Sequence, residues 1–387
     1  MSRRPHIILA ALQVRARSAG TGRAIRDLVS ALARRDRGLA FTVRASDPEL
    51  FREVQAMPHW RVEGCPGSEG GNLKKAWFTQ FRLPGLVRDL EGDLLHCLQF
   101  LAPVRCPCPV AVMVQDLAWR RYPETIERPR RFYYRWLVPR TLAAAAAIKT
   151  NSQATADETV EFYPSTTRKI RVTPLGTPTW TAEQSSVAGQ GRESSARPFF
   201  LFVGTLEPRK NLPRLLEAYG SFRTKALAEG REPSGIPDLV FVGGKGWGDS
   251  SLRSLLDRGR KEGWLVVKDY CAGAELWTLY RSALALVFPS LHEGFGLPIL
   301  EAMAAGLPVL TSDRGGTREV AGGNALLVDP TNTEDVAAGL RVMAFEPAVR
   351  QRLGEEGPRH AARWSWDRTA DLTEAVYREL LETGPDK

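Results

Sequence analysis

The chain has 387 residues, of which 43% are hydrophobic and 25% are charged, and its formal net charge is +9. These values are ordinary for a globular protein and exclude a disordered or fibrous chain. The length allows two domains, each with a full core. The first apolar run, residues 7–12, is too short for a signal-peptide core or a membrane span, so we expect a cytoplasmic protein.

The positive charge is concentrated in one half of the chain. Residues 1–190 carry 28 Lys and Arg against 17 Asp and Glu, whereas the remainder carries 25 against 27. This asymmetry favours an anionic partner such as phosphate or a membrane surface. The alternative is a solvated, arginine-rich surface with no partner. No recognised nucleic-acid motif accompanies the charge, so we expect no nucleic-acid partner.

The cysteines indicate a reducing compartment, because they are odd in number and scattered along the chain. Cys106 and Cys108 are separated by one proline and have no second pair, so the sequence predicts no zinc site. The five cysteines are Cys65, Cys97, Cys106, Cys108 and Cys271.

The first half begins with a predicted buried strand at residues 6–14, a loop containing Gly20 and Gly22, and a helix that ends near residue 35. A glycine loop between a strand and a helix suggests a dinucleotide site, but this loop is long and lacks the third glycine. Further strands are predicted at residues 41–44, 93–98, 110–114, 142–150 and 170–172. We assign residues 1–178 to an N-terminal domain.

Two of these strands carry polar residues at or near their ends. The strand at 93–98 contains His96 and leads into a loop, and Gln115 and Asp116 follow the strand at 110–114. Gln115 can donate and accept hydrogen bonds but cannot carry a charge. The alternative is that Gln115 only caps a loop.

Residues 119–140 interleave seven arginines with six aromatic residues. A basic amphipathic helix of this kind can lie on an anionic bilayer. Alternatively, the aromatic residues belong to the core and the arginines are solvated.

Residues 179–198 are polar and are predicted to be the interdomain linker. The second domain, residues 199–365, alternates strands with helices, which predicts a doubly wound parallel sheet. Its strands are expected at residues 199–203, 239–242, 265–267, 283–288, 307–311 and 325–328. Its helices are expected near residues 213–222, 251–262, 274–282, 298–305, 317–321 and 333–343, and residues 366–382 form a final amphipathic helix.

The loop that follows the first strand of this domain reads GTLEPRKN, residues 204–211. Asn211 is a plausible helix N-cap. Arg209 and Lys210 therefore follow the carboxyl end of a parallel strand, where such sheets bind ligands. Two cations beside a helix N-terminus can neutralise a diphosphate leaving group. The alternative is a solvated surface loop.

Residues 288–312 read as strand, glycine loop, helix and strand. The N–H groups and the dipole at the start of the helix can hold a phosphate. Glu293 and Glu301 lie eight positions apart, and a carboxylate within the helix suits sugar hydroxyls. Phosphate, ribose and a second sugar together describe a nucleotide sugar. Alternatively, Glu301 only complements the helix dipole.

The stretch EGFGLPILEAMAAGLPV, residues 293–309, resembles the Glu–seven residues–Glu motif of retaining glycosyltransferase family 4. The resemblance implies the GT-B fold: two doubly wound α/β, Rossmann-like domains facing across a cleft, with the helix at residues 366–387 crossing back onto the first domain. It also implies that Glu293 contacts the donor sugar and Glu301 the ribose, while the diphosphate meets Gly294, Phe295, Gly296 and Leu297.

Other site residues are carried over from the same resemblance. Arg209, Lys210, Glu293 and Gln115 are expected to be catalytic, and Gln115 stands where the family commonly has a histidine beside the donor sugar. Thr205 stands where the family often has an arginine. The remaining expected donor-site residues are Gly204, Thr205, Gly243 and Cys271, and the expected acceptor-side loops contain Gly20, Gly22, His96 and Asp116.

The activity implied is transfer of a hexose, mannose-like or glucose-like, from a nucleotide diphosphate sugar to an acceptor hydroxyl by a retaining, front-side route. The acceptor is a sugar, a lipid-linked glycan or a small molecule, so peripheral contact with a membrane is also expected. The sequence has no Asp–any–Asp triplet, so we expect no metal and no cofactor. Alternatives are an epimerase or phosphorylase of the same fold, or a non-catalytic subunit that binds sugar nucleotides.

Overall fold

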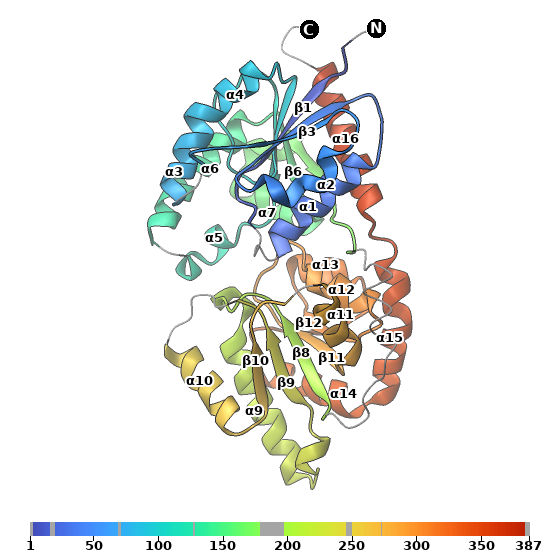
Figure 1. The fold of residues 1–387 in the computed structure, drawn as a ribbon. Coiled ribbons are helices and arrows are strands. Elements are labelled where there is room, and N and C mark those ends of the chain that lie inside the picture. Colours follow the sequence, from blue (N-terminus) through green and yellow to red (C-terminus); the bar gives the residue numbers. More distant parts are fainter. Residues whose placement is uncertain are drawn as a thin grey trace. The chain divides into compact units, whose positions relative to one another are not determined.

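A computed structural model describes residues 3–15, 20–68, 71–126, 128–178, 197–244, 250–271 and 273–383. The chain forms two compact units, which are described separately (Figure 1). The first combines Met1–Gly176 with Ser365–Lys387, and the second is Thr177–Trp364. Most of the predicted linker, residues 179–196, lies outside the described residues.

The first unit is built on a seven-stranded sheet in the order β3-β2-β1-β4-β5-β6-β7, with every neighbouring pair parallel. The order reverses between β1 and β4, as it does in doubly wound folds. The strands are β1 (His6–Ala11), β2 (Ala40–Ala45), β3 (Trp60–Gly64), β4 (Leu94–Cys97), β5 (Val110–Val114), β6 (Ala147–Thr150) and β7 (Ile170–Val172).

Helices cover both faces of this sheet (Figure 1). Between β3 and β4 the chain forms one continuous helical segment, in which a π-helical turn, η2 (Phe78–Arg82), joins α3 (Asn72–Trp77) to α4 (Leu83–Asp89). The other helices are α1 (Gly20–Ala33), α2 (Arg52–Gln55), α5 (Ala118–Arg121), α6 (Arg128–Ala144), α7 (Gln153–Phe162) and α16 (Trp366–Glu382).

The C-terminal helix α16 belongs to the first unit and packs against α1 and β4. Alternation along β4 explains how it is held, because successive side chains of a strand point to opposite faces. Leu95 and Cys97 join the core beneath α3, α4 and α6. His96 lies on the other face, where its Nδ1 is 2.6 Å from the hydroxyl of Tyr377 on α16. The predicted return of the last helix to the first domain is therefore confirmed.

The basic segment 119–140 divides its aromatic residues between core and surface. Trp119, Tyr133 and Tyr134 are buried, as the core interpretation predicts, whereas Phe132 and Trp136 are exposed. Among the described residues, no helix is both long enough and apolar enough to cross a bilayer.

The second unit has a six-stranded parallel sheet in the order β10-β9-β8-β11-β12-β13, which reverses between β8 and β11. The predicted doubly wound fold is confirmed in both units. The strands are β8 (Phe199–Val203), β9 (Asp238–Val242), β10 (Leu265–Lys268), β11 (Ala285–Phe288), β12 (Val309–Ser312) and β13 (Leu326–Val328). The helices are α9 (Leu212–Ala228), α10 (Ser250–Lys261), α11 (Gly273–Ser282), α12 (Leu297–Ala304), α13 (Gly315–Ala321), α14 (Thr333–Phe345) and α15 (Pro347–Ala361).

Candidate active site

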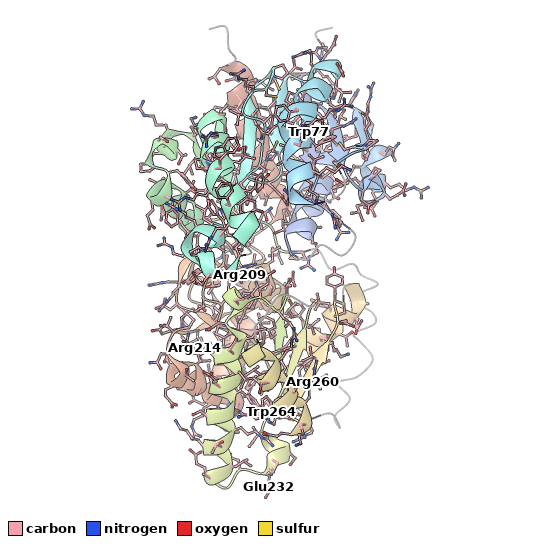
Figure 2. The ribbon with its side chains drawn as sticks, turned by 90° about the vertical axis from the view of Figure 1, so that its left-hand side faces the viewer. Trp77, Arg209, Arg214, Glu232, Arg260 and Trp264 are labelled. Carbon is pink, nitrogen blue, oxygen red and sulfur yellow. The ribbon has the colours of Figure 1, made fainter. Side chains whose placement is uncertain are left out.

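The candidate site lies at the carboxyl edge of the second unit's sheet, where the strand order reverses. The loops after β8 and β11 leave neighbouring parallel strands at this edge, which is where open α/β sheets bind ligands. Arg209 follows β8, whereas Glu232 precedes β9 and therefore lies near the amino edge. The two residues lie at opposite ends of the unit (Figure 2).

Two cations converge on one carboxylate in this site. The Arg209 guanidinium donates to Glu293 Oε2 at 2.8 Å, and the Lys210 ammonium pairs with Glu293 Oε1. Arg209 also donates to Glu207 at 3.0 Å. Lys210 is 6% exposed, and the Glu293 side chain is 9% exposed. The structure thus brings together the three charged residues that the sequence analysis assigned to catalysis in this domain.

Burial and the opposite charges nearby shift the pKa values of these groups in opposite directions. Burial alone would raise the pKa of Glu293, but Arg209 and Lys210 together lower that pKa to about 2. Burial and the nearby Arg209 lower the pKa of Lys210, and Glu293 partly offsets this effect. The Lys210 ammonium also lies 4.8 Å from the centre of the Phe288 ring, a cation–π contact. Glu293 is therefore an anion at neutral pH, held between two cations.

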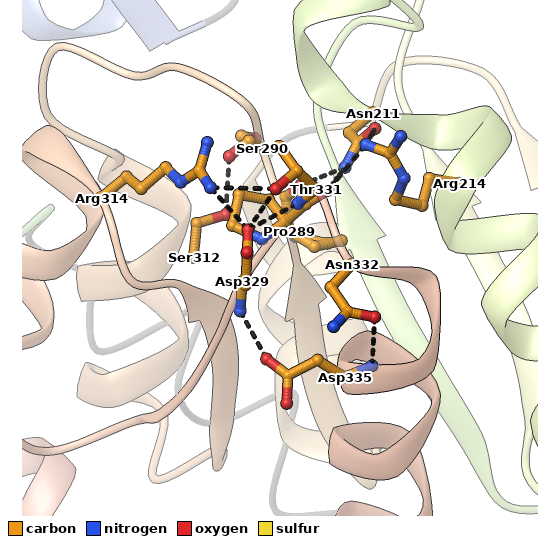
Figure 3. A network of polar contacts seen from close by, with 11 residues as sticks. Asn211, Arg214, Pro289, Ser290, Ser312, Arg314, Asp329, Thr331, Asn332 and Asp335 are labelled. Atoms are coloured by element: carbon orange, nitrogen blue, oxygen red, sulfur yellow. Dashed lines mark hydrogen bonds and ion pairs between the residues drawn. The ribbon is translucent and has the colours of Figure 1, made fainter.

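Asn211 fixes the loop that carries these cations, but it does so differently from the prediction. It precedes α9 in a left-handed conformation (φ 62°), and its side chain makes no N-cap hydrogen bond. Instead, its Nδ2 donates to the carbonyls of Pro289 at 3.1 Å and Pro330 at 2.6 Å. Arg214 donates to the same Pro330 carbonyl at 3.0 Å. Asn211 does stand at the N-cap position of α9, but its side chain does not cap the helix, because it joins the ends of three strands (Figure 3).

A polar network continues behind Asn211 (Figure 3). Asp329 accepts hydrogen bonds from Arg314 at 2.6 Å and from the backbone and side chain of Thr331, and its own N–H donates to Asp335 at 2.6 Å. The Ser312 hydroxyl donates to the carbonyl of Ser290 at 2.6 Å. These bonds tie the carboxyl ends of β11, β12 and β13 into one frame beneath the site.

A close backbone contact explains one of the predicted glycines, and a positive φ angle explains another. A Cβ atom at Gly243 would lie 2.0 Å from the carbonyl oxygen of Gly204, so the ends of β8 and β9 touch. Gly296 has φ 103° and precedes α12, a conformation that favours glycine. The sequence analysis missed Gly316, where a Cβ atom would lie 2.4 Å from the carbonyl oxygen of Gly294. The N-terminus of α13 therefore supports the loop at Gly294.

Glu301 lies inside α12 and is 1% exposed. The hydroxyl of Tyr280, from α11, donates to its Oε2 at 2.6 Å. Tyr280 was also missed, because it stands 21 positions away and no spacing rule connects the two residues. Its hydroxyl fixes the orientation of the carboxylate that we expected to hold a ribose.

The other expected donor-site residues line the same edge of the sheet. Phe295 and Leu297 are buried, and the Phe295 ring packs edge-on against Trp364 with ring centres 5.4 Å apart. Thr205 is partly buried after Gly204. Cys271 is buried after β10, and burial raises the pKa of its thiol. The described residues contain no group of three or more His, Cys, Asp or Glu side chains that could hold a metal ion.

The expected acceptor-side residues lie in the first unit. The expectation that Gly20 and Gly22 lie in a loop is wrong, because helix α1 already begins at Gly20 and Gly22 is buried within it. The carbonyl of Gln115 accepts from Asn151 Nδ2 at 2.8 Å, and Asp116 accepts from the N–H of Ala118 at 3.1 Å. Both residues follow β5 at the carboxyl edge of the sheet, as expected.

His96 does not lie on an exposed loop. It is inside β4, fully buried beneath α16, and burial, with a smaller effect of Lys149, lowers the pKa of its ring well below the usual value. The expectation that His96 faces an acceptor is wrong, because a partner 281 residues away, Tyr377, covers it.

Two family models match the two halves of the chain. One described as glycosyltransferase family 4 matches residues 18–180, and one described as glycosyl transferases group 1 matches residues 187–360. The chain is 30% identical over 299 residues to O-antigen chain mannosyltransferase B from Escherichia coli, which covers 76% of each protein. The chain belongs to the family 4 glycosyltransferases. It is also 32% identical over 255 residues to a D-inositol 3-phosphate glycosyltransferase from Saccharomonospora viridis, covering 62% of this chain and 57% of that protein.

Solved structures show that this glycosyltransferase has the GT-B fold. Sucrose-phosphate synthase from Thermosynechococcus elongatus superposes with a TM-score of 0.74 at 20% identity, covering 98% of this chain and all of that one. HepE from Anabaena in complex with UDP and glucose gives a TM-score of 0.69 at 19% identity, covering 97% of this chain and all of that one. At these identities the likeness establishes the fold.

Proposed function

We propose that this glycosyltransferase moves a hexose from a nucleotide diphosphate sugar to an acceptor hydroxyl with retention of the anomeric configuration and without a metal ion. A mannose-like hexose is favoured, because the relative from Escherichia coli is named a mannosyltransferase. A uridine nucleotide is a candidate for the nucleotide part of the donor, since HepE was solved with UDP.

One observation carries the proposal: Arg209 and Lys210 meet at Glu293 beside the N-terminus of α12. The dipole and the first N–H groups of α12 favour a diphosphate at this point. The two cations are already held in place, so they can stabilise the negative charge that grows on the departing diphosphate. Glu301, whose carboxylate is held by Tyr280, would accept hydrogen bonds from the ribose.

The proposed route is a front-side displacement. The bond between the anomeric carbon and the diphosphate oxygen breaks, and the acceptor oxygen bonds to the same face of the sugar. The acceptor proton passes to the departing diphosphate oxygen, so no protein base is needed. Gln115, which cannot take up a proton, is compatible with this route. Arg209 and Lys210 supply the positive charge that a metal ion supplies in other transferases.

We also propose a cytoplasmic location. All five cysteines are free in the structure, including Cys106 and Cys108, whose sulfur atoms are 3.8 Å apart. Unpaired cysteines suit a reducing compartment.

The test begins with a panel of nucleotide hexoses screened for thermal stabilisation, because a bound ligand raises apparent stability by mass action. The stabilising donor is then assayed for release of nucleoside diphosphate and for the anomeric configuration of the product by NMR. We expect acceptor-dependent release, a retained configuration and full activity in EDTA. An inverted product would contradict retention, and a loss of activity that a metal restores would contradict metal independence.

Two other outcomes would overturn the transferase proposal itself. Binding of the donor without turnover in the presence of any acceptor tried would indicate a non-catalytic subunit. Conversion of the free donor to its epimer, or phosphorolysis of a glycoside, would indicate an epimerase or a phosphorylase.

A further inference from the structure

The first unit exposes four large aromatic side chains. Trp77 is 55% exposed, Phe81 69%, Phe132 78% and Trp136 56%. Among the side chains that the structure describes, no other aromatic residue is as exposed as these. Large exposed apolar groups that gather on one face mark an interaction surface, whereas isolated ones need no explanation.

These side chains come from neighbouring elements on the same side of the sheet. Figure 1 shows α3, α4 and α6 on this side, and all three contribute to one buried core. Gln80 of η2 and Thr141 of α6 both donate to the carbonyl of Ala102, at 2.7 and 3.1 Å. The N–H of Val104, itself 38% exposed, donates to Gln80 at 3.0 Å. We call Trp77, Phe81, Val104, Phe132 and Trp136 the aromatic surface.

The π-helical turn explains why Phe81 points outward. Phe78 and Leu83 are five positions apart, which is one π turn, and both are buried. The residue inserted by this turn leaves Trp77 and Phe81 together on the opposite side, with ring centres 5.9 Å apart. Figure 2 labels Trp77 on this helical segment.

Helix α6 separates its two faces cleanly. Phe132, Trp136 and Arg140 follow one another at intervals of four and are exposed, while Tyr133, Tyr134, Leu137 and Val138 enter the core. The Arg140 guanidinium lies 4.3 Å from the Trp136 ring and also donates to the Trp136 carbonyl at 2.6 Å. The Arg140 guanidinium therefore holds the Trp136 indole in place on the exposed face of α6.

The helical segments that carry the aromatic surface are basic, and the only acidic residue within them is Asp89, the last residue of α4. Residues 72–88 and 128–144 include no Asp or Glu. The exposed cations of these segments are Lys74, Arg82, Arg88, Arg135 and Arg140. Arginines beside indole and phenyl rings suit the phosphate groups and the acyl boundary of a lipid bilayer.

We propose that the aromatic surface docks on an anionic phospholipid bilayer. This proposal differs in two respects from the membrane prediction made for residues 119–140. Within that segment, only the exposed side chains of α6 belong to the docking surface. The other part of the surface comes from the α3–η2 segment, which the sequence did not single out. The docking is peripheral, with aromatic rings at the depth of the head groups and arginines against lipid phosphates. This proposal goes beyond the proposed function and does not depend on the donor site.

Co-sedimentation of the full chain with vesicles tests this proposal. The vesicles contain either phosphatidylcholine alone or phosphatidylcholine with phosphatidylglycerol, each at low and high salt. We expect binding to the anionic vesicles only, weakened at high salt because exposed charges are screened. The double variants W77S/F81S and F132S/W136S should each lose at least about tenfold in affinity. The variant R135Q/R140Q should lose the salt dependence as well as affinity.

The matched control is L227S/V266S, which removes two exposed apolar side chains of the second unit and should bind vesicles normally. Equal binding to neutral vesicles, or full binding by both aromatic variants, would overturn the proposal. Sedimentation equilibrium without lipid tests a second occupant: a dimer that both aromatic variants abolish would assign the surface to another copy of the chain. Donor-induced stabilisation, measured on the same samples, reports the proposed function separately.

Discussion

At the scale of single residues, the site is organised by charges that are removed from water. Glu293, Arg209 and Lys210 are all largely buried, and each compensates for the cost of burying the others. Without a ligand, Glu293 is the counter-ion of both cations. A diphosphate would offer these cations a second anion, so the same geometry that stabilises the folded site also prepares it for a leaving group.

Lys210 is the residue whose charge we expect to matter most for rate. The variant Lys210→Met keeps the aliphatic length but removes the ammonium that would face the departing diphosphate. We expect the rate at saturating donor to fall by about 100-fold or more, as for other lost electrostatic stabilisers, with a smaller change in donor affinity. Single-turnover kinetics and calorimetry measure the two effects. Lys225→Met is the control, since Lys225 is exposed on α9 and pairs with Glu334. A Lys210→Met rate near that of the wild type would contradict the assignment.

Tyr280 is expected to act on donor binding through Glu301. Tyr280→Phe removes only the hydroxyl that donates to the buried carboxylate. We expect donor affinity to fall by roughly 1–3 kcal/mol, the cost of a buried polar group that loses its partner, and Glu301→Ala to have an effect of similar size. Tyr219→Phe is a matched control, because the Tyr219 hydroxyl is equally buried but donates to the Pro237 carbonyl, just before β9. Both phenylalanine variants should lower the melting temperature, and only Tyr280→Phe should weaken calorimetric donor binding.

At the scale of elements, α16 is held to the first unit by polar side chains as well as by apolar ones. Lys149 of β6, which is fully buried, donates to Thr373 at 2.6 Å. At the rim, Arg35 pairs with Asp371 and Arg171 with Glu379. Burying a charged amine costs folding free energy when its hydrogen-bond partner is only a hydroxyl. The stability of the first unit should therefore depend on pH.

The pH dependence follows from the lysine. Burial lowers the pKa of Lys149 from 10.5 to about 7. Below pH 7 the folded and unfolded chains both bind the proton, so the folded protein bears the full free-energy cost of burying the Lys149 charge. Between pH 7 and 10.5 only the unfolded chain keeps the proton, so stability rises with pH. Lys149→Met should stabilise the first unit at pH 7 by an amount on the order of 4 kcal/mol. It should also remove the rise in melting temperature between pH 7 and 9.5.

The melting temperature followed by circular dichroism at several pH values checks this prediction. Measurements above pH 7 avoid the titration of unfolded His96, whose folded pKa lies well below its ordinary value because it is buried. Lys74→Met, at an exposed position of α3, is the control and should leave the pH profile unchanged. A wild-type profile that is flat from pH 7 to 9.5 would show that Lys149 is charged in the folded protein.

The elements that the sequence predicted well are those with a simple period. The strands of the second unit are short apolar runs between turn residues, and all six were found within a few positions. Helix α15 was missed because it contains Gly354, Gly357 and Pro358, which normally indicate a turn. In the structure Gly357 approaches α12, where its Cβ would lie 3.3 Å from the Cα of Met303. The α3–η2–α4 segment was missed because the π turn shifts the helical period and Pro84 and Gly85 resemble a break.

At the scale of the whole molecule, the motif residues could be predicted and their supports could not. Glu293, Arg209 and Lys210 stand in recognisable loops after two strands, and the structure brings them together. Tyr280, Gly316 and the bonds of Asn211 depend on contacts between distant segments, which no local pattern records. The same reason explains the error at His96, because its environment is set by α16 at the other end of the chain.

The division into two units predicts which fragments of the protein can fold independently. Residues 177–364 are continuous in sequence and contain every expected donor contact except Gln115, whereas the first unit needs both residues 1–176 and residues 365–387. We expect the fragment 177–364 to fold and to bind the preferred nucleoside diphosphate within about fivefold of the full chain, a difference of about 1 kcal/mol.

The fragment 1–176 should not fold alone, because α1, β4 and the Phe41 ring would lose the cover that α16 and its Tyr377 provide and would expose apolar surface to water. Addition of a peptide spanning residues 365–387 should restore its structure. Proton NMR dispersion and calorimetry check both fragments. A folded fragment 177–364 that does not bind, beside a full chain that does, would show that the first unit supplies part of the donor site.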